Sequence, residues 1–158
     1  MATALRNLSA YDSAALPDVG AYRFGIVVAD WHSELTTVLA QGAADTLQQH
    51  GARPECLTVL RVPGSFELTY GAQQLAKHPE IDAVICLGVV IRGETKHDDY
   101  INHAVAQGLT TVSLKYDKPV VFGLVTTNDL QQAQDRSGGR HGNKGVEAAV
   151  TAIRLLHP

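Results

Sequence analysis

Four short apolar runs rich in β-branched residues divide this 158-residue chain, and segments with helical periodicity separate them. This alternation is typical of βαβ units in a parallel sheet, because parallel strands need a crossover connection between them. The predicted strands are Phe24 to Ala29, Leu57 to Val62, Ala83 to Ile91 and Val120 to Thr126.

Helices are predicted between the strands, where apolar residues recur at i, i+3, i+4 and i+7. The first ends before Gly51, a second begins at about Asp98, and the last contains Val146. The first helix should turn one face to the core, formed by Leu35, Val38, Leu39, Gly42, Ala43, Thr46 and Leu47.

Two further helices are predicted from capping signals. One follows Ser65 as N-cap, and the other follows Asn128, with Gln131 three residues on as in a capping box. Four strands and five helices predict an α/β fold, a three-layer αβα sandwich with a four-stranded parallel sheet in flavodoxin-like order.

The chain length fits one domain. Residues 1–21 show neither strand nor helix periodicity, and they contain the turn-forming residues Pro17 and Gly20. We therefore expect an N-terminal arm followed by a single domain over 22–158. Small parallel sheets leave open edges, and such an arm could pair with the sheet of a neighbouring subunit.

Composition narrows the classes of partner. A formal net charge of −3 gives no basic footprint for nucleic acid, and no apolar run is long enough for a membrane span. No apolar stretch follows the start of the chain, so we expect a cytoplasmic protein without a secretory signal.

The two cysteines, Cys56 and Cys86, are both predicted in strands. If their strands flank a common neighbour they lie about 9.5 Å apart, too far for a disulfide, so we expect reduced core residues. No Cys/His spacing resembles a zinc site, and we expect no metal.

Polar or aromatic residues follow every predicted strand, at Asp30–His32, Pro63–Glu67, Arg92–His97 and Thr126–Asn128. The carboxyl ends of parallel strands meet at one edge, where open α/β sheets bind ligands. The loop from Arg92 to His97 leads into a helix N-terminus, which favours an anion, and His97 can move a proton near neutral pH. We therefore expect an anionic substrate and a proton-transfer reaction.

Each of these residues also has a structural interpretation. The single tryptophan, Trp31, could stack on a flat heterocycle or be a core or interface aromatic. Glu67 would be favoured by a helix dipole without binding anything, and His97 could be a surface histidine.

The segment Arg136–Gly145 combines glycines with two arginines and a lysine before the last helix. It suits phosphate binding, or is a solvated loop. Neither it nor Arg92–Thr95 has the spacing of a Walker loop or a dinucleotide fingerprint, so ATP and NAD are not expected.

Four motifs occur in the order and spacing of 6,7-dimethyl-8-ribityllumazine synthases, namely Val62–Leu68, Leu87–Thr95, Pro119–Thr126 and Gly142–Gly145. From about Arg23 to Leu156 the chain resembles that family. The resemblance implies a transferase that condenses 5-amino-6-(D-ribitylamino)uracil with 3,4-dihydroxy-2-butanone 4-phosphate, releasing phosphate and water, in the penultimate step of riboflavin biosynthesis. It implies no cofactor.

The resemblance also implies roles for individual residues. Trp31 would stack on the pyrimidine, Phe66 and Glu67 would hold the ribityl chain, and the backbone of Val89 and Val90 would bind the uracil edge. Backbone amides around Glu94 and Thr95 with Arg136 would bind phosphate, and His97 would be the catalytic proton shuttle. The implied substrate-binding set is Trp31, Ser65, Phe66, Glu67, Val89, Val90, Ile91, Glu94, Thr95, Phe122, Arg136 and Lys144.

In this family Phe122, Arg136 and Lys144 come from the adjacent subunit, so the site requires a homo-oligomer. The resemblance implies a pentamer. It leaves open a further icosahedral shell of pentamers, since the connection from Arg136 to Gly145 has the short form.

Four positions depart from the family's usual residues: Asp30 is commonly Arg, His32 Asn, Thr69 Pro, and Asp98 an aromatic. Asp98 could raise the basicity of His97 if the two touch.

Two alternative functions are compatible with the same fold. One is a non-catalytic flavin- or lumazine-binding protein, and the other is a flavodoxin-like electron carrier.

Overall fold

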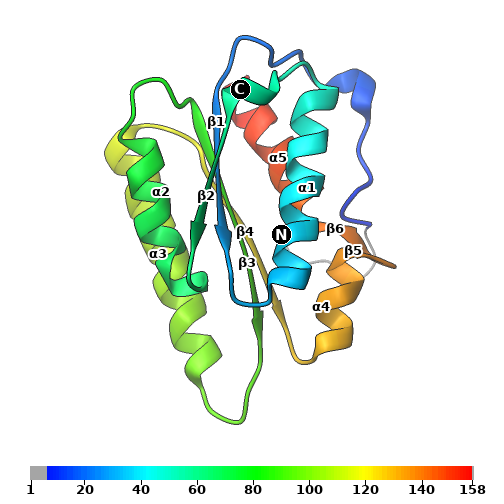
Figure 1. Cartoon of the computed structure of the whole chain (residues 1–158), viewed down its shortest axis with the longest axis vertical. Helices are drawn as coiled ribbons and strands as arrows, with labels where there is room; N and C mark the ends of the chain where they lie inside the picture. Colours follow the sequence, from blue (N-terminus) through cyan, green and yellow to red (C-terminus); the bar gives the residue numbers. More distant parts are fainter. Residues whose placement is uncertain (1–6, 158) are drawn as a thin grey trace.

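A computed structural model describes residues 7–157 of the chain (Figure 1). Its main sheet has four parallel strands in the order β2-β1-β3-β4. The strands are β1 (Phe24–Ala29), β2 (Leu57–Val62), β3 (Ala83–Ile91) and β4 (Val120–Thr127). The predicted fold class and strand order are confirmed, and only β4 runs one residue further than expected.

Helices cover both faces of the sheet, as Figure 1 shows. On one face lie α1 (Ser33–Gln49) and α5 (Lys144–Leu156), and on the other α2 (Leu68–Ala76) and α3 (His97–Tyr116). A short α4 (Leu130–Arg136) follows β4. Three 3₁₀ turns complete the helical elements, η1 (Ser13–Ala15), η2 (Pro54–Cys56) and η3 (Ser65–Glu67).

The strand period of two divides the buried side chains between two cores. Ile26 and Ile85 pack toward α1 and α5, whereas Val27 and Cys86 pack toward α2 and α3, and all four are completely buried. Both faces of the central strands are therefore apolar, which explains their continuous hydrophobic runs.

The cysteines are buried and free, as predicted. Burial raises the pKa of the Cys86 thiol, so it is a neutral core group. The prediction that Cys56 lies in a strand is wrong: it ends η2, directly before β2.

Both predicted caps differ from the structure. Ser65 caps no helix, because its buried hydroxyl is directed to the Val89 carbonyl, 3.5 Å away. The capping box at α4 is shifted by one residue. Asp129 is the N-cap and accepts from the Gln132 amide, and the Gln132 side chain accepts from the Asn128 amide.

A small hairpin occupies much of the segment predicted as a loop. It consists of β5 (Ser137–Gly139) and β6 (Gly142–Asn143), an antiparallel pair in which Gly138 and Gly142 have positive φ. Val38 of α1, expected in the core, is 41% exposed. Its carbonyl accepts from the Asn143 side chain, so this turn of α1 borders the hairpin instead.

The described part of the arm, residues 7–21, contacts its own subunit. The Leu8 amide donates to the His141 carbonyl, and Val19 is completely buried in the core between the sheet and α1. Residues 1–6 of the predicted arm lie outside the described residues, and pairing with a neighbour stays a prediction. Across residues 7–157, no helix has the length and apolar character of a membrane span.

Candidate active site

The four strands deliver their following residues to one edge of the sheet. Backbone hydrogen bonds continue past the strand ends, from the Asp30 amide to the Val62 carbonyl and from the Trp31 amide to the Pro63 carbonyl. The sheet thereby fixes the start of each loop. Side chains from β1, β2 and β3 are brought together as the strand-end rule predicts.

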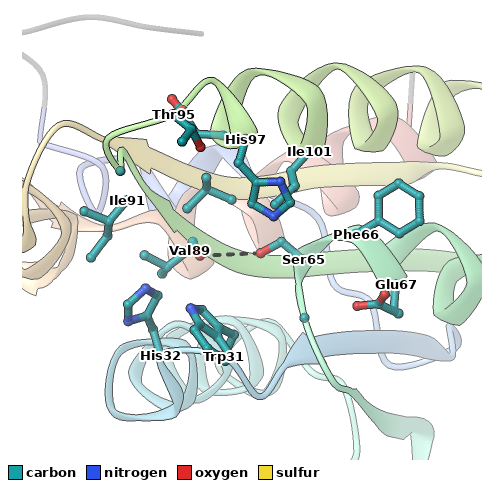
Figure 2. Close-up of a pocket in the computed structure, with 14 residues that line it drawn as sticks. Trp31, His32, Ser65, Phe66, Glu67, Val89, Ile91, Thr95, His97 and Ile101 are labelled. Carbon is teal, nitrogen blue, oxygen red and sulfur yellow. Dashed lines mark hydrogen bonds between the residues drawn. The ribbon is translucent and has the colours of Figure 1, made fainter.

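A pocket of about 700 Å³ opens at this edge (Figure 2). It contains nine of the predicted site residues: Trp31, Ser65, Phe66, Glu67, Val89, Val90, Ile91, Thr95 and His97. His32, Gly64, Gly93, Asp98 and Ile101 complete its wall.

Trp31 forms part of one wall with most of its surface uncovered. It is 69% exposed in the subunit, which excludes the interpretation as a core aromatic. Its ring meets the imidazole of His32 edge-on, with centroids 6.2 Å apart. The indole face is therefore available to a planar ligand.

His97 lies across the pocket from Trp31, as Figure 2 shows. It is the first residue of α3, and the loop Arg92–Lys96 joins it to β3. The Arg92 amide donates to the Thr127 carbonyl, which anchors the start of that loop. An imidazole in this position can exchange protons with a ligand in the pocket.

Asp98 also lines the pocket, next to His97. The expected effect on basicity required the two side chains to touch. Among the described residues, no ion pair within 4 Å joins a carboxylate to His97. That condition is not met in the subunit.

The segment after β2 forms the floor and one end of the pocket. Ser65 is buried against β3, which requires the glycine at position 88: a Cβ there would lie 2.6 Å from the Ser65 Oγ. Phe66 is 58% exposed, and Glu67 lies beside it at the end away from His32 (Figure 2). Glu67 is the N-cap of α2 without a side-chain cap hydrogen bond, so its carboxylate is not required for capping.

Glu94 is not part of the pocket wall, although its neighbours Gly93 and Thr95 are. The remaining predicted residues, Phe122, Arg136 and Lys144, are not brought to the pocket either. They line a second hollow of about 710 Å³, which we call the β4–α5 hollow.

The cations of the β4–α5 hollow have local partners. The Lys144 Nζ lies 2.7 Å from the Glu147 Oε1, and an Arg136 Nη donates to the Gln132 carbonyl at 3.0 Å. Phe122 projects from β4, an edge strand, and is 40% exposed. The third charge of the hairpin region, Arg140, pairs instead with Asp135 at 3.4 Å.

Three of the wall residues that the sequence did not assign had a recognisable signal. His32 and Asp98 each neighbour a residue that was assigned. Ile101 lies four residues after His97 and so shares its helix face.

Residues 7–157 contain no group of three or more His, Cys, Asp or Glu arranged to hold a metal ion.

Known proteins resemble the chain over almost its whole length. The family model described as 6,7-dimethyl-8-ribityllumazine synthase matches residues 21–157. A protein of that name from Parabacteroides distasonis is 55% identical over 157 residues, covering 99% of this chain and 98% of the relative. Others from Phocaeicola vulgatus (50% identical; 99% and 93% covered) and Cytophaga hutchinsonii (51%; 99% and 98%) carry the same name.

Proposed function

We propose, because this chain belongs to the 6,7-dimethyl-8-ribityllumazine synthase family, that its strand-end pocket binds both substrates of that reaction. The chain is a transferase of riboflavin biosynthesis. It condenses 5-amino-6-(D-ribitylamino)uracil with 3,4-dihydroxy-2-butanone 4-phosphate to the lumazine, releasing phosphate and water. The non-catalytic alternative is not favoured.

The observation that carries the site assignment is a single pocket with an exposed indole on one wall and an imidazole on the other (Figure 2). A flat pyrimidine fits against Trp31 with its amine toward His97. Attack of that amine on the ketone, imine formation, loss of phosphate and ring closure all need proton transfers. His97 can serve each of them, for a gain of about 10² to 10⁴ in rate.

Orientation contributes more than proton transfer. Two substrates held in one pocket react with effective molarities that can reach about 10⁵ to 10⁸ M. The backbone of β3 supplies a rigid edge for this purpose. Its pairing with β1 ends at Leu87, so the last residues of β3 have no strand partner on that side.

Alternation along β3 decides which backbone groups face the pocket. The amides of Val84 and Arg92 donate toward the β4 side, so the amide of Val90 faces β4 as well. Val89 and Ile91 face the opposite side, where the Ser65 hydroxyl is directed to the Val89 carbonyl. On this alternation we assign the uracil edge to the backbone of Val89 and Ile91, in place of the Val89 and Val90 that the resemblance implied, and Val90 contributes to the pocket wall.

The remaining groups of the substrates fit the two ends of the pocket. The ribityl chain fits beside Phe66, with its hydroxyls toward the carboxylate of Glu67. The phosphate fits the backbone amides around Thr95, where the loop that also contains Glu94 leads into the twenty-residue α3 and a helix N-terminus favours an anion.

The β4–α5 hollow supplies the residues that the pocket lacks. In this proposal Phe122, Arg136 and Lys144 of one subunit close the pocket of the next, and Arg136 binds the phosphate there. The assembly is a pentamer, alone or as part of an icosahedral shell.

Incubation with both substrates tests the catalytic assignment. Lumazine absorbance should rise above the uncatalysed rate. No excess over that rate would leave a binding protein on the same fold, and flavin phosphate released on denaturation would indicate an electron carrier.

Analytical ultracentrifugation across phosphate concentration and pH tests the assembly. We expect pentamers or multiples of pentamers. A stable monomer would contradict the shared site, whereas pentamers under all conditions would exclude only the shell.

A further inference from the structure

An ion pair outside the strand-end pocket holds the corner of the chain that carries Trp31. We propose that this pair, formed by Asp30 and Arg61, positions the indole and so sets how tightly the pyrimidine substrate binds. Neither residue lines the pocket, so both act through Trp31 and not by touching the substrate. The inference rests on the proposed function, in which the pyrimidine stacks on the indole.

The indole of Trp31 has little packing of its own (Figure 2). It is 69% exposed, and among residues 7–157 its one aromatic neighbour is His32, whose ring it meets edge-on. The rotamers open to a side chain depend on the backbone dihedrals beneath it. Whatever fixes the backbone of this corner, residues 29–32, therefore also fixes the direction of the indole.

Hydrogen bonds tie the corner to its neighbours before and at Trp31. The Ala29 carbonyl accepts from the buried hydroxyl of Thr36 in α1, at 2.7 Å. The Trp31 amide donates to the Pro63 carbonyl, at 3.1 Å. The corner is thus attached to α1 on one side and to the segment after β2 on the other.

A single guanidinium joins these two attachments through the residue that lies between them. One Nη of Arg61 donates to the Asp30 Oδ1 at 2.7 Å, and the other donates to the Thr37 Oγ1 at 3.0 Å. Arg61 belongs to β2, Asp30 follows β1 and Thr37 lies in α1, so three elements meet on one side chain. The planar fork of arginine holds its two acceptors in a fixed geometry.

The exposure of the pair indicates where its effect should appear. The side chains of Arg61 and Asp30 are 42% and 53% exposed, and an ion pair at such a site contributes little to folding. A small free energy is nevertheless sufficient to restrict an exposed side chain that has few other contacts. We expect the pair to act on the direction of the indole and on pyrimidine affinity, with little effect on the folded fraction.

Two measurements on the assembled protein follow these effects separately. Trp31 is the single tryptophan, so fluorescence anisotropy without ligand reports the mobility of this indole alone. Calorimetric titration with 6-(D-ribitylamino)uracil, which lacks the 5-amino nucleophile, gives Kd for the pyrimidine site without turnover. Steady-state KM for the butanone phosphate provides the comparison, because that substrate has no ring to stack on the indole.

Asp30→Ala and Arg61→Ala should each lower the anisotropy and raise Kd for the probe by about 1.4- to 5-fold, the worth of a partly exposed ion pair. The double variant should match Arg61→Ala, because the two residues act through one contact. Thr37→Val removes one of the two acceptors and should give a smaller change in the same direction. KM for the butanone phosphate should stay at the wild-type value in all four variants.

Glu55→Ala is the matched control. Glu55 forms an exposed ion pair with Arg53 at 3.5 Å, just before β2 and so at the opposite edge of the sheet from the pocket. Like Asp30→Ala, this variant removes one surface carboxylate, so it controls for the change in net charge. Its anisotropy and Kd should equal those of wild type.

The outcomes separate the inference from the proposed function. Wild-type anisotropy and Kd in both single alanine variants, or losses that multiply in the double variant, would overturn the inference and leave the proposed function in place. A rise in KM for the butanone phosphate equal to the rise in Kd would also overturn it, because a general disturbance would then explain both. A wild-type protein that does not bind the probe would overturn the proposed function, and the anisotropies would still test whether the pair holds the indole.

Discussion

The strand-end pocket and the β4–α5 hollow have nearly the same volume, about 700 and 710 Å³, but opposite chemistry. Among residues 7–157, the pocket is lined by the tryptophan and two histidines and by no lysine or arginine. In the same part of the chain, the hollow is lined by two cations, Arg136 and Lys144, and by no histidine. In our proposal, the condensation uses both sets of residues because one of its substrates is phosphorylated.

The two regions also differ in how they are built. The pocket is assembled by the parallel sheet, since three strand ends fix its walls within one chain. The hollow lies along the edge strand β4 and helix α5, and Leu8 and Arg136 also line it. In our proposal, the folding of one chain supplies the groups for proton transfer and stacking, whereas the cations that bind phosphate come from a second subunit.

The largest effect is expected from the pocket. His97→Ala should lower kcat by up to about 10² to 10⁴, and more than it raises KM, because the proton shuttle is removed while the binding groups remain. Steady-state kinetics corrected for the uncatalysed reaction would measure this. His103→Ala, on an exposed turn of the same helix, should behave as wild type. A wild-type kcat in His97→Ala would remove His97 from the mechanism.

A substitution in the hollow should instead weaken the binding of only one of the two substrates. Arg136→Ala should raise KM for the butanone phosphate by about 10- to 150-fold, the worth of a hydrogen bond between charged groups, and leave KM for the pyrimidine unchanged. Arg136→Lys should recover part of this, because it keeps the charge without the planar fork. Arg140→Ala is the matched control, since Arg140 does not line the hollow. Equal losses for both substrates would indicate damaged assembly.

Co-assembly of two impaired variants tests whether the pocket of one subunit meets the hollow of its neighbour. Co-assembly of His97→Ala with Arg136→Ala subunits should restore activity to about one quarter of wild type in a random equimolar mixture, because some pockets then pair with an intact hollow of the neighbour. Each variant assembled alone provides the baseline. If the mixture gives only the mean of the two parents, pocket and hollow act within one chain and the shared-site model fails.

A substitution in the floor of the pocket should lower the free energy of unfolding. Gly88→Ala would place a Cβ 2.6 Å from the Ser65 Oγ and 2.8 Å from the Leu124 Cδ1, and such overpacking costs about 1–3 kcal/mol. Chemical denaturation would measure the change. Gly93→Ala adds a Cβ into open space and should leave the unfolding free energy nearly unchanged. Equal stability of the two variants would contradict the tight packing inferred at Gly88.

The strands of the sheet could be predicted because the residues of each strand and its flanking turns mark it in the sequence. Each central strand is a continuous apolar run between turn signals, and the observed bounds follow those runs. The caps were less predictable, because alternatives one residue apart look equally good and packing decides between them. Ser65 has the sequence of an N-cap, but the Val89 carbonyl, 24 residues away, lies within reach of its hydroxyl.

The site was predictable to the extent that strand ends define it. Trp31 and His97 lie in the segments that follow β1 and β3, so topology brings them together. Glu94 shows the limit, because neighbours in a loop need not face the same way, and Thr95 lines the pocket while Glu94 does not. The hairpin of residues 137–143 was missed because glycines carry no hydrophobic period, and its order depends on contacts with α1.

The smallest effect should come from stacking on Trp31, and it distinguishes the pocket from the hollow most directly. Riboflavin should quench Trp31 fluorescence, because the flavin ring would lie against an indole that is 69% exposed, and no other tryptophan contributes to the signal. Trp31→Leu should weaken riboflavin binding by about 2- to 13-fold, the worth of an aromatic pair. Phe122→Leu, which changes an aromatic of the hollow, is the informative comparison. If it leaves the quenching intact in the assembled protein, the flavin ring is held by the pocket wall alone. An emission spectrum unchanged at saturating riboflavin would instead leave Trp31 as an interface aromatic.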